Sequence, residues 1–182
     1  MHTRVLLLRG VNVGGKHRLP MHALIEIMQG LDLHDIHTVI QSGNAVFRSE
    51  NARHSDNLAD RIERAIDRVH GFRPRALILN AEPWKSAVRS NPFPQAESQP
   101  KSLHLSFLAE APAQPDMRRI EHIRAPEERY VLSERVFYLY APNGIGRSRL
   151  AASVEKLLGV PITARNWRTV KKIDAVLLAM DA

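Results

Sequence analysis

The chain has 182 residues, of which 44% are hydrophobic and 25% are charged, a composition typical of a soluble globular protein. It contains no cysteine, which excludes disulfides, thiolate metal ligands and cysteine nucleophiles. Its first apolar run, Val5 to Leu8, is too short for a signal peptide or a membrane span, so we expect a cytoplasmic protein with no membrane partner.

The formal net charge of +7 is concentrated in two segments. Residues 9–18 hold three basic side chains and no acidic one, and residues 147–172 hold seven basic side chains against a single glutamate. The rest of the chain is therefore slightly acidic. Two local patches of this kind attract anions, whether small or polymeric.

The first half of the chain predicts the element order β-α-β-β-α-β. We expect strands at 3–9, 36–41, 44–48 and 75–79, with Ser42-Gly43 as a tight turn between the second and third. A first helix at 20–30 is indicated by apolar residues at helical spacing, starting at Met21. A second helix is expected from Ser55, as its N-cap, to Gly71.

The second half repeats this order less regularly. Strands are expected at 103–108, 130–132, 136–140 and 162–165, helices at 116–123 and 147–158, and an extra helix at 169–180. The pattern predicts an α+β fold of two tandem ferredoxin-like βαββαβ halves, a pseudo-duplication with antiparallel sheets and an added C-terminal helix. We place the first half at 1–80, a proline-rich linker at 81–101, and the second half with its extra helix at 102–182.

The loop after the first strand is the strongest candidate for a binding site. A ferredoxin-like sheet has the strand order 4-1-3-2, which brings this loop and the turn at 41–44 to the same end of the sheet. Together they offer glycine N–H groups, amides, a hydroxyl and cations, which suit a phosphate or carboxylate. The candidate ligand-binding residues are Arg9, Asn12, Gly14, Gly15, Lys16, Gln41, Ser42 and Asn44.

Two other interpretations of this loop compete with an anion-binding site. Gly10 to Lys16 satisfies most of a P-loop, but His17 stands where Ser or Thr must reach Mg²⁺, and Pro20 delays the helix. These departures argue against nucleotide hydrolysis. Alternatively, the glycines only satisfy the backbone geometry of a long connection.

A secondary basic patch lies near the C-terminus. Its members are Arg147, Ser148, Arg165, Asn166, Trp167 and Arg168. The structural alternative is that Asn143 or Ser148 caps one helix, that Asn166 or Thr169 caps the next, and that Trp167 anchors packing. Base stacking of the kind used by RNA-recognition domains is not favoured, because the first and third strands carry one aromatic residue, Phe47.

The nine histidines do not form a metal-ligand set. His34 and His37 are close in sequence but have no acidic or histidine partner at metal spacing. We predict no metal and no cofactor.

Several short segments form a recognisable set: Leu7 to Lys16, Pro20-Met21, Gln41 to Asn44, Asn91-Pro92-Phe93, and Arg165-Asn166-Trp167 with Thr169-Val170. Together they resemble the bacterial domain-of-unknown-function 1697 family. The resemblance covers nearly the whole chain and implies two tandem ferredoxin-like halves with no assigned reaction. His17 stands where Asn is more usual in the family, and Arg149 where Lys is more usual.

Three functions follow as hypotheses. The first is a binding module for an anionic or phosphorylated small molecule, held by the loop and the turn. The second is an enzyme acting on a phosphorylated small molecule or nucleotide, with the same residues as electrostatic stabilisers. The third, and the least favoured, is weak binding to the nucleic-acid backbone through residues 147–172. The sequence leaves the ligand, any catalysis, the oligomeric state and the orientation of the halves open.

Overall fold

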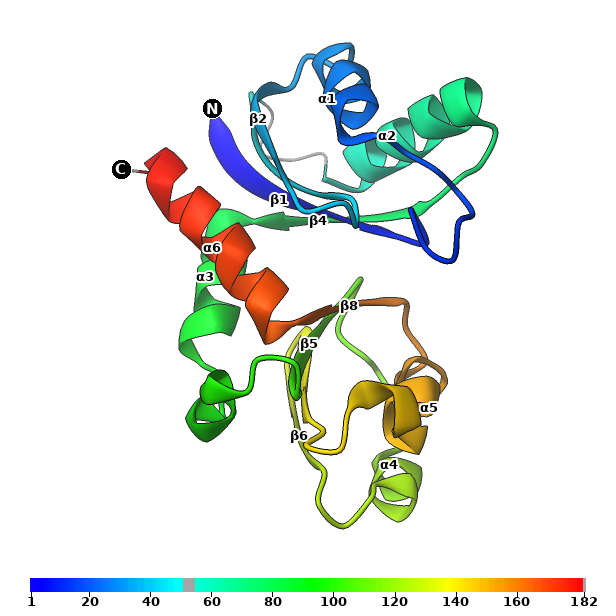
Figure 1. Cartoon of the computed structure of the whole chain (residues 1–182), viewed down its shortest axis with the longest axis vertical. Coiled ribbons are helices and arrows are strands. Elements are labelled where there is room, and N and C mark those ends of the chain that lie inside the picture. Colours follow the sequence, from blue (N-terminus) through cyan, green and yellow to red (C-terminus); the bar gives the residue numbers. More distant parts are fainter. Residues whose placement is uncertain (51–54, 182) are drawn as a thin grey trace. The chain divides into compact units, whose positions relative to one another are not determined.

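The computed structural model describes residues 1–50 and 55–181, with side chains described from residue 57 onward after the gap (Figure 1). Its first six elements confirm the expected order. They are β1 (His2–Arg9), α1 (Met21–Gln29), β2 (His34–Val39), β3 (Asn44–Ser49), α2 (Ser55–His70) and β4 (Arg75–Asn80). The side chain of Ser55, expected to cap α2, lies outside the described part of the chain.

The first sheet has the strand order β2-β3-β1-β4, which confirms the predicted ferredoxin-like topology. All three pairings are antiparallel. In the central strand, Val5 lies opposite Val46 of β3 and Leu79 of β4. This order places the loop after β1 and the turn between β2 and β3 at one end of the sheet.

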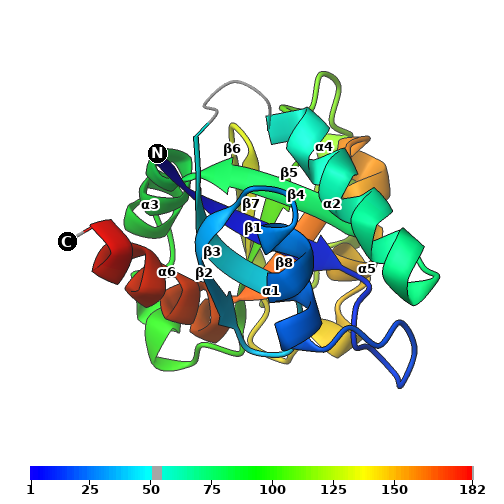
Figure 2. The same cartoon turned by 90° about the horizontal axis from the view of Figure 1, so that it is seen from above.

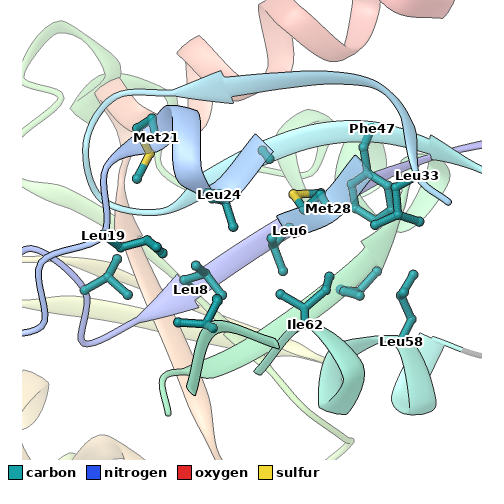
Figure 3. Packing of buried hydrophobic residues seen from close by; sticks show 14 residues of the cluster. Leu6, Leu8, Leu19, Met21, Leu24, Met28, Leu33, Phe47, Leu58 and Ile62 are labelled. Atoms are coloured by element: carbon teal, nitrogen blue, oxygen red, sulfur yellow. The ribbon is translucent and has the colours of Figure 1, made fainter. Parts of the chain in front are cut away.

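One face of this sheet is covered by α1 and α2 (Figure 1, Figure 2). Strand residues alternate between faces, so Leu6 and Leu8 both point toward the helices. They meet the buried stripe of α1 and the apolar face of α2, including Ile62 (Figure 3). Leu19, at the end of the loop after β1, is fully buried in the same cluster. Burial of a leucine side chain is worth roughly 2–3 kcal/mol, which anchors this end of the loop.

The second half builds the same architecture. Its elements are β5 (Leu103–Leu108), α4 (Met117–Ile123), β6 (Arg129–Ser133), β7 (Val136–Tyr140), α5 (Arg149–Leu158) and β8 (Ile162–Asn166). The strand order is β6-β7-β5-β8, again antiparallel throughout. Its core lies between the sheet and the two helices α4 and α5. The predicted duplication is therefore confirmed at the level of topology.

Local capping explains where the helices of this half begin. The carboxylate of Asp116 accepts a hydrogen bond from Arg119 N at 2.9 Å at the start of α4. The Ser148 hydroxyl accepts from Ala151 N at 2.9 Å, so α5 begins at Arg149, two residues later than expected. A short 3₁₀ turn over Ile145–Arg147 occupies the preceding residues.

Two features differ from the predicted domain organisation. Residues 81–101, expected as a linker, contain helix α3 (Ala81–Arg89) and a 3₁₀ helix (Pro94–Ser98). Pro83 is compatible with α3 because it lies in the first turn, whose N–H groups have no intrahelical acceptor. The chain divides into one unit of residues 1–88 and 171–182 and a second of residues 89–170.

The last helix, α6 (Trp167–Asp181), therefore joins the first unit through most of its length, whereas the sequence placed it with the second half. Asp181 explains this assignment. Its carboxylate accepts from Thr3 Oγ1 at 2.9 Å and pairs with Lys85 Nζ at 2.6 Å. The Lys85 ammonium holds the pKa of Asp181 below its ordinary value. None of the described helices is both long enough and apolar enough to span a bilayer.

Candidate anion-binding site

Residues 10–19, here called the hairpin loop, fold back on themselves between two buried anchors. Val11 is 2% exposed and Leu19 is fully buried. Between them, Asn12 N donates to the His17 carbonyl at 3.0 Å and Lys16 N donates to the Val13 carbonyl at 3.1 Å. A β-bridge pairs Val13 with Lys16. The loop is therefore a miniature β-hairpin that projects from the end of the first sheet (Figure 1, Figure 2).

The glycines Gly14 and Gly15 form the two-residue turn of this hairpin. Their φ angles are +58° and +75°. Two successive positive φ values define a type I′ turn, which side chains other than those of glycine and asparagine rarely allow. The requirement for glycine is thus geometric. The same geometry leaves the N–H groups of both residues solvent-exposed and without an acceptor among the described residues.

Asn12 joins the hairpin loop to the turn between β2 and β3. Its Nδ2 donates to the Leu19 carbonyl at 2.8 Å and to the Gln41 carbonyl at 2.7 Å. Its Oδ1 accepts from Leu19 N at 2.8 Å. The predicted convergence of loop and turn is therefore observed. Both amide hydrogens are used within the protein, so Asn12 fixes the loop and has no donor left for a ligand.

Asn44 has a similar internal role. It is fully buried, and its Nδ2 donates to the Val39 carbonyl at 3.0 Å and to Ser42 Oγ at 2.9 Å. Gly43 lies so close to β1 that a Cβ atom there would be 2.7 Å from Val11 Cγ2. Of the four turn residues 41–44, Gln41 has an exposed side chain and Ser42 a half-buried one.

The cations of the loop are exposed. Lys16 and Arg18 have no ion-pair partner among the residues that the structure describes. Arg9 is exposed at the end of β1, directly opposite Arg75 of β4 in the antiparallel register. Like charges facing each other across two strands are unfavourable by roughly 0.2–1 kcal/mol.

The ordered position of the His17 ring was not expected from the sequence. Its imidazole stacks on Phe72, with ring centroids 4.7 Å apart and an interplanar angle of 16°. The His17 ring nitrogen Nδ1 lies 2.9 Å from the Gly10 carbonyl oxygen. In the sequence, this contact is signalled only by Phe72, which directly follows Gly71 at the end of α2. The position of Phe72 does not show that its ring stacks on His17.

The secondary basic patch separates into structural and exposed members. Ser148 caps α5, and Asn166 Oδ1 accepts from Thr169 N at 2.9 Å at the start of α6. Trp167 is 3% exposed, so its ring is not a platform for base stacking. Burial lowers the pKa of Arg165 to about 10, which marks a guanidinium withdrawn from water. The exposed members of the patch are Arg147 and Arg168.

Each of these two arginines lines a different cavity of the second unit. Arg147 lines a cavity of about 350 Å³ together with the buried Glu128, and Arg168 lines another of about 280 Å³ with Lys101. Gly144 contributes to both cavities. The first cavity is of mixed charge and the second is basic.

Phe47 is the aromatic residue that strands β1 and β3 carry. It is fully buried on the helix-facing side of the first sheet, so it does not offer a surface for base stacking.

No group of three or more histidine or acidic side chains among the described residues has the spacing of a metal site. His104 of β5 is 8% exposed, and its Nδ1 is buried without a hydrogen-bond partner in the described part of the chain. Burial lowers the pKa of His104 to about 4, so its imidazole is neutral at physiological pH.

The two sheets, their helices and their strand orders define a tandem ferredoxin-like protein of the α+β class. The chain belongs to the family described as protein of unknown function, DUF1697, whose model matches residues 1–138. A solved structure with the same fold is that of the conserved bacterial protein SP0830 from Streptococcus pneumoniae. It is 24% identical, the match covers 97% of this chain and 98% of that chain, and the TM-score is 0.64. None of the curated proteins compared with the chain matches it.

Proposed function

We propose that the hairpin loop binds the anionic group of a phosphorylated or otherwise anionic small molecule. The observation that carries the proposal is the pair of exposed N–H groups at Gly14 and Gly15, with the ammonium group of Lys16 next to them in the chain. Backbone N–H groups in a turn, accompanied by a flexible cation, are a recurrent arrangement for phosphate and sulfate.

Rigidity of the loop supports this proposal. A loop that must become ordered on binding loses affinity, at about 1–2 kcal/mol for each residue whose backbone becomes fixed. Here Asn12 and the buried anchors already fix the hairpin, and Asn44 fixes the neighbouring turn. The eight predicted site residues therefore divide into two groups. One group supports the loop or lies beside that support: Asn12, Gln41, Ser42 and Asn44. The other group contacts the ligand: Arg9, Gly14, Gly15 and Lys16.

Charge in the surroundings is also favourable. Arg9, Arg18 and Arg75 add positive charge at the same end of the sheet. Two acidic residues of α2, Asp60 and Glu63, are paired with Arg73. The local field therefore attracts anions and depends on ionic strength.

A thermal-shift and calorimetry series with sulfate, pyrophosphate, sugar phosphates and nucleotides tests the proposal. We expect at least one of these anions to raise the Tm of the wild type, and the double variant Lys16→Ala/Arg18→Ala to lose this response. The matched control is Arg61→Ala/Arg68→Ala, which removes the same charge from the exposed face of α2.

The proposal is wrong if no anion stabilises the wild type, or if both double variants lose the response equally. A different result would favour nucleic-acid binding through the exposed arginines of the second unit. In that case DNA or RNA would bind the Lys16→Ala/Arg18→Ala variant as well as the wild type, with an affinity that falls steeply with salt.

A further inference from the structure

The imidazole of His17 is held more firmly than an exposed histidine normally is. The His17 carbonyl accepts from Asn12 N at 3.0 Å, Nδ1 contacts the Gly10 carbonyl at 2.9 Å, and one ring face stacks on Phe72. The backbone φ of +52° is part of the same arrangement. The ring therefore has a fixed position at the base of the hairpin loop while remaining solvent-exposed.

The contact with Gly10 also fixes the tautomer. A carbonyl oxygen only accepts hydrogen bonds, so Nδ1 must carry the hydrogen. In the neutral ring Nε2 is then the basic nitrogen, the arrangement that orients histidines used for proton transfer or ligand binding. Nε2 of His17 has no hydrogen-bond partner among the described residues, and it belongs to an exposed side chain.

The charged neighbours of this ring are mainly positive. On its own loop they are Lys16 and Arg18, and Arg9 lies at the end of β1. On the segment after α2, Arg73 follows Phe72 and is already paired with carboxylates, and His70 lies against Phe72 with ring centroids 6.3 Å apart. A bound anion would stabilise an imidazolium beside it.

We infer that His17 is an anion-contacting residue of this site and that its Nε2 donates a hydrogen bond to the bound group when the ring is protonated. The inference rests on the proposed function. Because binding and protonation then favour each other, anion binding takes up a proton and tightens as the pH falls. The ligand class that fits is one whose anionic group keeps its charge at mildly acidic pH, such as a sulfate ester or a diphosphate diester.

Sulfate is the probe that separates the protein's titration from that of the ligand, because its charge is constant between pH 5.5 and 8. We expect sulfate to bind the wild type about five- to tenfold more tightly at pH 5.5 than at pH 8, the size of one exposed charge-assisted hydrogen bond. His17→Asn removes the titrating group and retains a side chain that tolerates positive φ. This variant should bind sulfate with the same affinity at both pH values.

A matched control is His22→Asn, which changes an exposed histidine of α1 and should leave the pH dependence intact. Nitrogen-15 spectra of the imidazole provide a second readout, expected to show the Nδ1–H tautomer at pH 8 and protonation of both nitrogens with sulfate at pH 5.5. Absence of sulfate binding at every pH overturns the proposed function. Binding whose pH dependence is the same in wild type and His17→Asn, or an Nε2–H tautomer at pH 8, overturns the inference about His17 alone.

Discussion

Replacement of Asn12 should loosen the hairpin loop by an amount that the geometry allows one to work out. Asn12→Ala removes three hydrogen bonds of 2.7–2.8 Å, each worth about 1 kcal/mol net. It also places a Cβ-bearing residue with no local hydrogen bond at φ +54°, which costs about 1 kcal/mol more. The substitution leaves the N–H and the carbonyl of Leu19 without their side-chain partner. Because Leu19 is buried, water does not readily replace it. We expect the free energy of unfolding to fall by about 3–4 kcal/mol.

Urea unfolding followed by far-UV circular dichroism measures this loss. Asn12→Gly removes the same hydrogen bonds without the backbone strain, so it should cost about 1 kcal/mol less than Asn12→Ala. The control is Gln41→Ala, because Asn12 donates to the backbone carbonyl of Gln41 rather than to its side chain. That variant should change stability by less than about 0.5 kcal/mol. An Asn12→Ala loss below about 1 kcal/mol, or one equal to that of Gln41→Ala, would show that these hydrogen bonds do not hold the loop in place.

Two further predictions concern backbone packing and pH. Gly43→Ala and Gly10→Ala both place alanine at positive φ, but only the Gly43 Cβ meets close neighbours, at 2.7 Å from Val11 and 2.8 Å from Leu8. Gly43→Ala should therefore lower the free energy of unfolding by about 1–3 kcal/mol more than Gly10→Ala, and equal losses would contradict the close approach. Burial lowers the pKa of His104 to about 4 from 6.5, so protonation favours the unfolded chain. Its contribution is complete above pH 6.5 and is lost as the pH falls toward 4, by about 3 kcal/mol in all. Unfolding curves between pH 7 and 4 should show this loss in the wild type and a smaller one in His104→Leu.

Much of the fold could be predicted because the apolar periodicity is local. The strands 103–108 and 136–140 were predicted with their observed bounds, since turn residues flank each apolar run. The segment 81–101 was not, because its four prolines indicated an irregular connection. One of them, Pro83, instead occupies the first turn of α3, where proline costs little.

The site was predicted at the level of segments but less well at the level of single residues. Topology brought the hairpin loop and the 41–44 turn together, as the hydrogen bond from Asn12 to Gln41 confirms. Sequence could not tell that the Asn12 and Asn44 amides point inward, because the direction of an amide depends on carbonyls supplied by the tertiary structure. The same limit applies to His17, whose ring is ordered by a residue 55 positions further along the chain.

We propose that the bound anion contacts the N–H groups of the hairpin turn. The most direct test is a proton–nitrogen correlation spectrum of the protein titrated with sulfate at constant ionic strength. We predict saturable shifts of the Gly14 and Gly15 amide resonances, with Gly30 and Gly159 unaffected. Shifts that are absent from Gly14 and Gly15, or that are largest at Gly144, would contradict the claim.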